Sequence, residues 1–314
     1  MARGKIGVAL GGGVARGWSH IGVLKALEKS GFKPDIVAGT SIGAVAGGCY
    51  VAGKLDELEV FARSLTRRRV FGFLDFNMSG SGLISGDKLG DRIASHLGDT
   101  QIETLDRRFV AVATEIGTGH EIWLSRGHLV DAMRASYALP GIFRPVKLGG
   151  RWLFDGAIVN PIPVSVCRAM GANIVIAVNL QSDSLGRGAV LSDQRTLEEI
   201  ETDGLDGSMV EQQKGGGALK LLHRQFFGRG SDAPGISTVM MEAFNITQDR
   251  IARSRLAGDP PDFTISPKLA HIGTFDFHRA DELIAIGEAA AERALAEIRA
   301  ELSPAQTHAH AHVS

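Results

Sequence analysis

Cysteine is scarce in this chain, since only Cys49 and Cys167 occur among its 314 residues. Two cysteines exclude a framework of several disulfides, which fits a reducing compartment. Both lie in apolar stretches with helical spacing, so we expect them to be small core residues. The chain is 44% hydrophobic and 22% charged, the balance of an ordinary globular protein, and it is long enough to bury a core without metals.

Long hydrophobic runs are also missing. No stretch approaches the roughly 18 apolar residues that a transmembrane helix requires. The apolar run near Met1 is too short for a signal peptide, so we expect a cytoplasmic protein. The formal net charge of -1 gives no reason to expect nucleic-acid binding.

Glycine, by contrast, is abundant, with 40 residues gathered in a few places where tight turns are expected. Short apolar runs alternate with stretches of helical spacing, which indicates an α/β fold with a mostly parallel sheet covered on both faces. The runs 146–148 and 152–154 flank Gly149-Gly150 and predict a hairpin. We predict one domain over residues 1–306.

Two segments depart from this pattern. Residues 181–235 are polar and contain few large apolar side chains, which predicts a mobile insert or lid. Within it, residues 218–230 mix apolar and basic side chains, which fits a packed surface helix first and peripheral contact with the inner face of a membrane as the alternative. Residues 307–314 form a histidine-containing tail that we expect to be disordered.

Gly39-Thr40-Ser41-Ile42-Gly43 fits the G-x-S-x-G nucleophile elbow. Such a serine lies on a sharp strand-to-helix turn, where side chains in place of the glycines would clash. The following helix directs its N-terminal end at the serine oxygen and favours negative charge there. The motif alone is weak, but here it directly follows a predicted strand and precedes a predicted helix.

A second glycine cluster, Gly11 to Gly17, also joins a predicted strand to a predicted helix. A phosphate-binding P-loop requires Lys followed by Ser or Thr, whereas Trp18-Ser19 follows here. A dinucleotide fingerprint fits poorly because Arg16 takes the place of its last glycine. The remaining interpretation is an oxyanion hole made of backbone N–H groups, which requires a nucleophile nearby.

The third element, Asp155-Gly156-Ala157, follows a predicted strand. It is either an ordinary turn or a general base for Ser41, made more basic by burial. A Ser-His-Asp triad is the alternative, and His223, His271 and His278 have the required chain order. None of them follows a convincing strand end, and His20 fits a role in positioning the glycine loop.

Together these elements resemble the patatin-like phospholipases, and in particular the bacterial branch related to neuropathy target esterase. Further similarity lies in Ala135 to Phe143 with Pro145, in Asn160 to Pro163, and in Asp249 to Asp262. The resemblance implies a three-layer α/β/α sandwich and a Ser-Asp dyad that works without histidine, metal or cofactor. By the same resemblance the site residues are the nucleophile Ser41, the base Asp155, the elbow glycines Gly39 and Gly43, the oxyanion donors Gly11, Gly12 and Gly13, and the loop-positioning Arg16.

The resemblance implies a serine esterase that cleaves acyl esters, phospholipid or lysophospholipid, through an acyl-enzyme. An alcohol acceptor in place of water would make the protein an acyltransferase. The residues do not exclude two other functions: a regulator of weak activity that acts through partner binding, and a nucleotide-binding protein. The sequence does not distinguish a phospholipase from a lysophospholipase or a carboxylesterase, nor does it indicate an oligomeric state.

Overall fold

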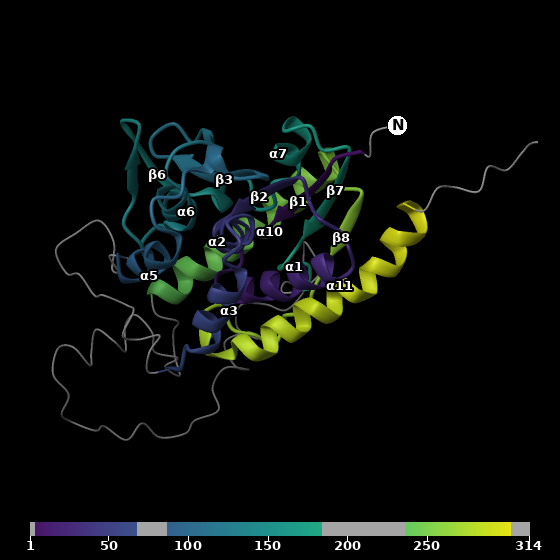
Figure 1. Cartoon of the computed structure of the whole chain (residues 1–314). Helices are drawn as coiled ribbons and strands as arrows, with labels where there is room; N and C mark the ends of the chain where they lie inside the picture. Colours follow the sequence, from purple (N-terminus) through teal and green to yellow (C-terminus); the bar gives the residue numbers. More distant parts are fainter. Residues whose placement is uncertain (1–3, 68–86, 184–235, 303–314) are drawn as a thin grey trace, which may run out of the picture. The chain divides into compact units, whose positions relative to one another are not determined.

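A computed structural model describes residues 4–67, 87–183 and 236–302 of the chain (Figure 1). The chain divides into two compact units, one of residues 1–184 with 246–314 and one of residues 185–245. All but the first three residues of the predicted insert 181–235 lie outside the described residues, as do the segment 218–230 and the tail 307–314. The first unit holds every predicted site residue.

A mixed sheet with a mostly parallel centre organises the first unit. The strand order is β5-β6-β3-β2-β1-β7-β8, with β4 paired to β3 beside this path. The strands are β1 (Ile6–Leu10), β2 (Ile36–Thr40), β3 (Arg108–Glu115), β4 (Glu121–Leu124), β5 (Val146–Leu148), β6 (Arg151–Asp155), β7 (Ile174–Val178) and β8 (Phe263–Ile265). Strands β3, β2, β1, β7 and β8 run parallel, and the predicted hairpin is confirmed as the antiparallel pair β5–β6.

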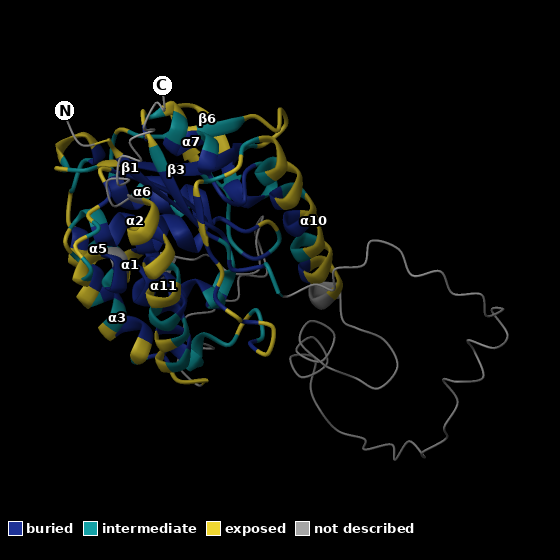
Figure 2. Cartoon of the chain, turned by 90° about the vertical axis from the view of Figure 1, so that its right-hand side faces the viewer, coloured by how far each residue is buried: buried dark blue, intermediate teal, exposed yellow. Residues whose placement is uncertain are grey.

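Helices cover both faces of this sheet and complete a three-layer α/β/α sandwich, which confirms the predicted fold class. The helices of the described residues are α1 (Ser19–Lys29), α2 (Ile42–Val51), α3 (Leu55–Arg63), α5 (Asp87–Leu97), α6 (Leu129–Tyr137), α7 (Val164–Ala169), α10 (Ile236–Gly258) and α11 (Ala280–Leu302). Figure 2 shows the strands as a buried layer between them.

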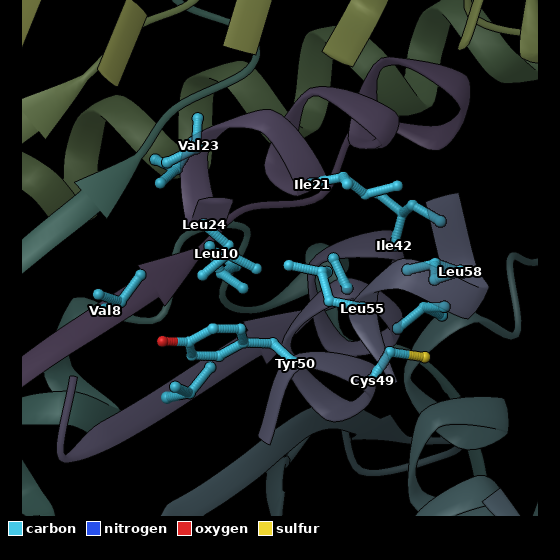
Figure 3. Close-up of a cluster of buried hydrophobic side chains, with 14 of the residues drawn as sticks. Val8, Leu10, Ile21, Val23, Leu24, Ile42, Cys49, Tyr50, Leu55 and Leu58 are labelled. Carbon is cyan, nitrogen blue, oxygen red and sulfur yellow. The ribbon is translucent and has the colours of Figure 1, made fainter. Parts of the chain in front are cut away.

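The two faces of the central strands build two separate cores, because successive strand residues point to opposite faces. Val8 and Leu10 of β1 belong to the core under α1, α2, α3 and α11, whereas Ala9 belongs to the core under α7 and the end of α10. Figure 3 shows Val8 and Leu10 among side chains of α1 and α2. Cys49 and Cys167 are buried free thiols, as predicted, one in each core.

Helices α1 and α11 lie side by side (Figure 1), and they pack closely at two glycines. A Cβ added to Gly22 of α1 would lie 2.0 Å from the carbonyl oxygen of Ile284, and one added to Gly287 of α11 would lie 2.0 Å from that of Ser19. Because neither position has room for a methyl group, backbone packs directly on backbone here. In the described segments we find no helix with the length and apolar character needed to cross a membrane.

Candidate active site

Two strand ends meet against β3 and bring Ser41 and Asp155 together. Strand β2 runs parallel to β3 with Thr40 beside Val112, whereas β6 runs antiparallel with Asp155 beside Ala113. Strand β4 also pairs with β3, at residues that β2 and β6 contact from the other side. Strand β4 therefore occupies the opposite edge of β3. Strands β2 and β6 therefore share one edge of β3 and approach each other end to end.

Ser41 has the strained backbone that a nucleophile elbow requires. It lies between β2 and α2 with φ 57° and ψ -126°, a left-handed φ that residues with a side chain rarely adopt. A Cβ on Gly39 would lie 2.5 Å from the carbonyl oxygen of Gly43, and a Cβ on Gly43 would lie 2.2 Å from that of Leu10. Both elbow glycines are thus required by close backbone approach, as the motif predicted.

The Ser41 hydroxyl donates a hydrogen bond to Asp155 Oδ2 over 2.6 Å. The other carboxylate oxygen, Oδ1, accepts the backbone N–H of Ala157 over 2.8 Å. The backbone of Asp155 is held as well, because its N–H donates to the Ala138 carbonyl and its own carbonyl accepts the Thr114 hydroxyl. The carboxyl group therefore faces Ser41 in a single defined orientation.

Burial controls the protonation of this carboxyl group. Asp155 is only 1% exposed, and loss of solvation raises its pKa from 3.8 to about 7, although the hydrogen bonds from Ser41 and Ala157 oppose the shift. A carboxylate with a pKa near neutrality is a far stronger base than an exposed aspartate and is still ionised at slightly alkaline pH. This is the property required of a general base.

Ser136 on α6 supports the elbow from behind, a role that the motif analysis did not predict. Its hydroxyl accepts the backbone N–H of Ser41 over 2.9 Å and donates to the Val112 carbonyl over 2.6 Å. Ser136 is fully buried, so both bonds are shielded from water. The only sequence signal is that Ser136 lies in the family-like segment Ala135 to Phe143.

The glycine loop lies against the dyad but offers fewer free donors than predicted. A Cβ on Gly12 would lie 3.6 Å from Ser41 Cβ, so the loop does border the nucleophile. However, the N–H groups of Gly11 and Gly12 donate to the carbonyls of Val178 and Pro161. Each of these N–H groups is therefore already used in this structure, and the oxyanion role of Gly11 and Gly12 stays a prediction. The N–H of Gly13 has no acceptor among the described residues.

Two side chains hold this loop. Arg16 donates from Nε and Nη2 to the Ile272 carbonyl over 3.1 and 2.8 Å. The His20 ring contacts the Gly11 carbonyl over 2.7 Å through Nε2, and burial lowers the pKa of His20 to about 4. The ring is therefore neutral at pH 7 and donates from Nε2–H, so its contact is with the loop rather than with Ser41.

The residues that the structure describes supply no histidine partner for Ser41 or Asp155. Within residues 4–67, 87–183 and 236–302, no histidine hydrogen-bonds to Ser41 or Asp155, and His271 pairs instead with Glu282. His223 lies outside the described residues. In the same part of the chain, no group of three or more His, Cys, Asp or Glu side chains is arranged to hold a metal ion.

Comparison with known proteins identifies the class to which this fold and site belong. The chain belongs to the patatin-like phospholipase family, which matches residues 8–168 and so includes the glycine loop, Ser41 and Asp155. This family consists of hydrolases of lipid esters.

Individual relatives point to one branch of that family. An uncharacterised NTE family protein of Mycobacterium tuberculosis is 32% identical over 93% of this chain and 91% of its own length. The lysophospholipase NTE1 of Yarrowia lipolytica is 37% identical over 56% of this chain, a region that makes up 13% of that protein. The crystal structure of VipD from Legionella pneumophila aligns with a TM-score of 0.47 at 13% identity, over 94% of this chain and 67% of that one.

Proposed function

We propose that this protein is a serine esterase that hydrolyses acyl esters of phospholipids or lysophospholipids through a Ser41–Asp155 dyad. The observation that carries the proposal is the 2.6 Å hydrogen bond from the Ser41 hydroxyl to a buried carboxylate, at a residue with φ 57°. Strain of this kind persists only where the surrounding structure enforces it, and it is typical of catalytic positions. Membership of a family of lipid ester hydrolases gives independent support.

In the acylation step Ser41 Oγ attacks the ester carbonyl carbon while its proton passes to Asp155 Oδ2. The pKa of Asp155, raised by burial to about 7, makes this transfer more favourable than it would be to an exposed aspartate. The carbonyl oxygen becomes negative in the tetrahedral intermediate. The N–H of Gly13, which has no acceptor in the described part of the chain, and the N-terminal end of α2 are the backbone groups suited to stabilise it.

Collapse of the intermediate breaks the bond to the alcohol. The proton on Asp155 passes to the leaving oxygen, so the alcohol departs neutral and Asp155 is again ionised. A water molecule then gives its proton to Asp155 and adds to the acyl-enzyme carbonyl. Return of that proton to Ser41 Oγ releases the carboxylic acid and restores the dyad.

The substrate class follows from the relatives rather than from a shaped pocket. The Yarrowia protein and a second relative, from Emericella nidulans, both carry the name lysophospholipase. We therefore propose a single-chain acyl lipid as the first substrate to assay, with a two-chain phospholipid and a short aryl ester beside it.

The test is labelling with a fluorophosphonate, which forms a stable adduct only with an activated serine. Wild type, Ser41→Ala and Asp155→Asn are compared by mass spectrometry and in the three hydrolysis assays. We expect one adduct on Ser41, none in Ser41→Ala, and slower labelling and turnover in Asp155→Asn by at least about a hundredfold. Ser95→Ala, an exposed serine of α5 bonded only within its own helix, is the control and retains wild-type rates.

A folded wild-type protein with neither adduct nor hydrolysis, in the presence of lipid, would overturn the esterase proposal. Labelling and turnover that survive in Asp155→Asn would retain the nucleophile but reject Asp155 as its base.

A further inference from the structure

Gln248 on α10 lies beside the glycine loop and has no role in the dyad described above. It is only 3% exposed. A Cβ built on Gly12 would lie 3.4 Å from Gln248 Oε1, 3.6 Å from Ser41 Cβ and 3.3 Å from Ala157 Cβ. Gln248 Oε1 and Ser41 therefore flank the same glycine, although the two residues are more than 200 positions apart in the chain.

The two ends of the Gln248 amide are in different situations. Its Oε1 accepts a hydrogen bond from Gln181 Nε2 over 2.7 Å, which fixes the plane of the group. Its Nε2 has no acceptor in the described part of the chain, and it is not among the fully buried atoms there that lack a partner, so it keeps contact with solvent. An amide nitrogen carries two protons, and both are therefore available to a molecule that enters the site. Such a donor near the proposed dyad is placed to meet an acceptor on the substrate.

The site is short of oxyanion donors, because Gly11 and Gly12 use their N–H groups on the carbonyls of Val178 and Pro161. A neutral amide suits the missing role. A lysine or arginine there would attract the carboxylate and lower the pKa of Asp155, making it a poorer base. An amide stabilises a negative oxygen without this penalty, and glutamine or asparagine side chains serve in oxyanion holes elsewhere.

We propose that Gln248 donates an Nε2–H hydrogen bond to the oxyanion that forms on the substrate carbonyl, beside the N–H of Gly13. This role rests on the proposed esterase function. No bond to Gln248 is made or broken, and its protons stay on nitrogen throughout. Gln181 is then a positioning residue. It donates to Gln248 Oε1 and so directs Gln248 Nε2 away from Gln181.

The experiment compares two substitutions that separate donation from packing. Gln248→Met keeps the length of the side chain but removes both polar atoms. Gln248→Glu keeps an acceptor for Gln181 and replaces the donor by a negative oxygen. Gln101→Met is the matched control, because the side-chain amide of Gln101 bonds only to Asp99. For each protein, kcat and KM on an aryl ester, the rate of fluorophosphonate labelling and the melting temperature are measured.

We expect both Gln248 variants to lose about 10²–10³ in kcat, the usual effect of removing one oxyanion donor, with little change in KM. Labelling slows in parallel, because the phosphonyl oxygen uses the same donors, while Gln101→Met matches wild type. A folded Gln248→Met or Gln248→Glu variant that keeps the kcat of Gln101→Met overturns the inference. Should Gln248→Met fail to fold, the Gln248→Glu rates decide alone.

Failure of this inference is distinct from failure of the esterase proposal. A wild-type protein that labels on Ser41 and turns over, with Gln248 variants at control rates, rejects Gln248 alone. A wild-type protein without adduct or turnover rejects the esterase function and this role with it.

Discussion

At the scale of single residues, the environment of Asp155 determines what the site can do. A carboxylate in water is a weak base with a pKa near 4. Within the described residues no cation is among the causes that shift the pKa of Asp155, and loss of solvation outweighs its two hydrogen bonds. The same chemical group therefore becomes a base suited to neutral pH because of where the fold holds it.

This environment predicts the pH dependence of hydrolysis. In the proposed mechanism only ionised Asp155 accepts the Ser41 proton, and the pKa of Asp155 is raised to about 7. We expect kcat/KM on a neutral ester to fall about tenfold per pH unit below 7 and to level off above it. Initial rates between pH 5 and 9 provide the measurement. His20 cannot produce this limb, because its pKa is lowered to about 4. Rates that stay constant from pH 9 down to pH 5 would contradict the raised pKa of Asp155.

The same shift predicts that Asp155 reduces stability. Its folded-state pKa of about 7 exceeds the unfolded value of 3.8, so the folded state favours the protonated form and loses stability as pH rises through that window. We expect Asp155→Asn to be more stable than wild type at pH 8, by more than the roughly 1.4 kcal/mol that one pKa unit represents. The difference in free energy of unfolding between Asp155→Asn and wild type becomes smaller at pH 5. Urea unfolding at pH 5 and pH 8 tests this prediction, and equal differences at the two pH values would contradict it.

At the scale of secondary-structure elements, helix α6 helps to hold the turn at Ser41. Ser41 keeps a positive φ while its N–H is held by the Ser136 hydroxyl, which in turn bonds to β3 through Val112. A strand, a turn and a helix that are separate in the sequence are thus joined by one buried hydroxyl.

We expect Ser136→Ala to weaken both the fold and the site. It leaves the Ser41 N–H and the Val112 carbonyl without their partner, at a cost of about 1–3 kcal/mol for a buried unpaired group. Because Ser41 then loses its restraint, fluorophosphonate labelling slows as well. Denaturant unfolding and labelling rates measure the two effects, with Ser95→Ala on exposed α5 as the control. Unchanged stability and labelling would show that the Ser136 bonds are dispensable.

At the scale of the first compact unit, the crossing of α1 and α11 connects a C-terminal helix to the glycine loop. Gly287 packs against the Ser19 carbonyl, and the Ser19 hydroxyl donates to the Arg16 carbonyl within the loop. Arg16 also reaches the Ile272 carbonyl, in the segment before α11. A helix that contains no dyad residue thereby helps to position the loop beside Ser41.

We therefore expect Gly287→Ala to destabilise the protein, although alanine is a better helix former than glycine. Its methyl group would lie 2.0 Å from the Ser19 oxygen, and overpacking of this kind costs about 1–3 kcal/mol or more. Gly258→Ala is the control, since a Cβ there meets nothing within 4 Å. Thermal melting of both variants gives the comparison. Equal melting temperatures would show that the two helices can separate without loss.

Local sequence patterns were sufficient to predict the strands, the helices and the main motifs of the site. Alternating apolar runs and helical spacing predicted the layered fold, and the glycines around Ser41 predicted a turn that leaves no room for side chains. These features depend on neighbouring residues and on backbone sterics, which a sequence displays directly.

Long-range placement was the part that local patterns could not provide. That β2 and β6 share one edge of β3, so that Ser41 meets Asp155, follows from pairing between distant strands. The use of the Gly11 and Gly12 N–H groups by Val178 and Pro161, and the position of Gln248 beside Gly12, also arise from distant contacts. Hydrogen-bond partners and burial depend on which segments pack together, and that is decided only when the whole chain folds.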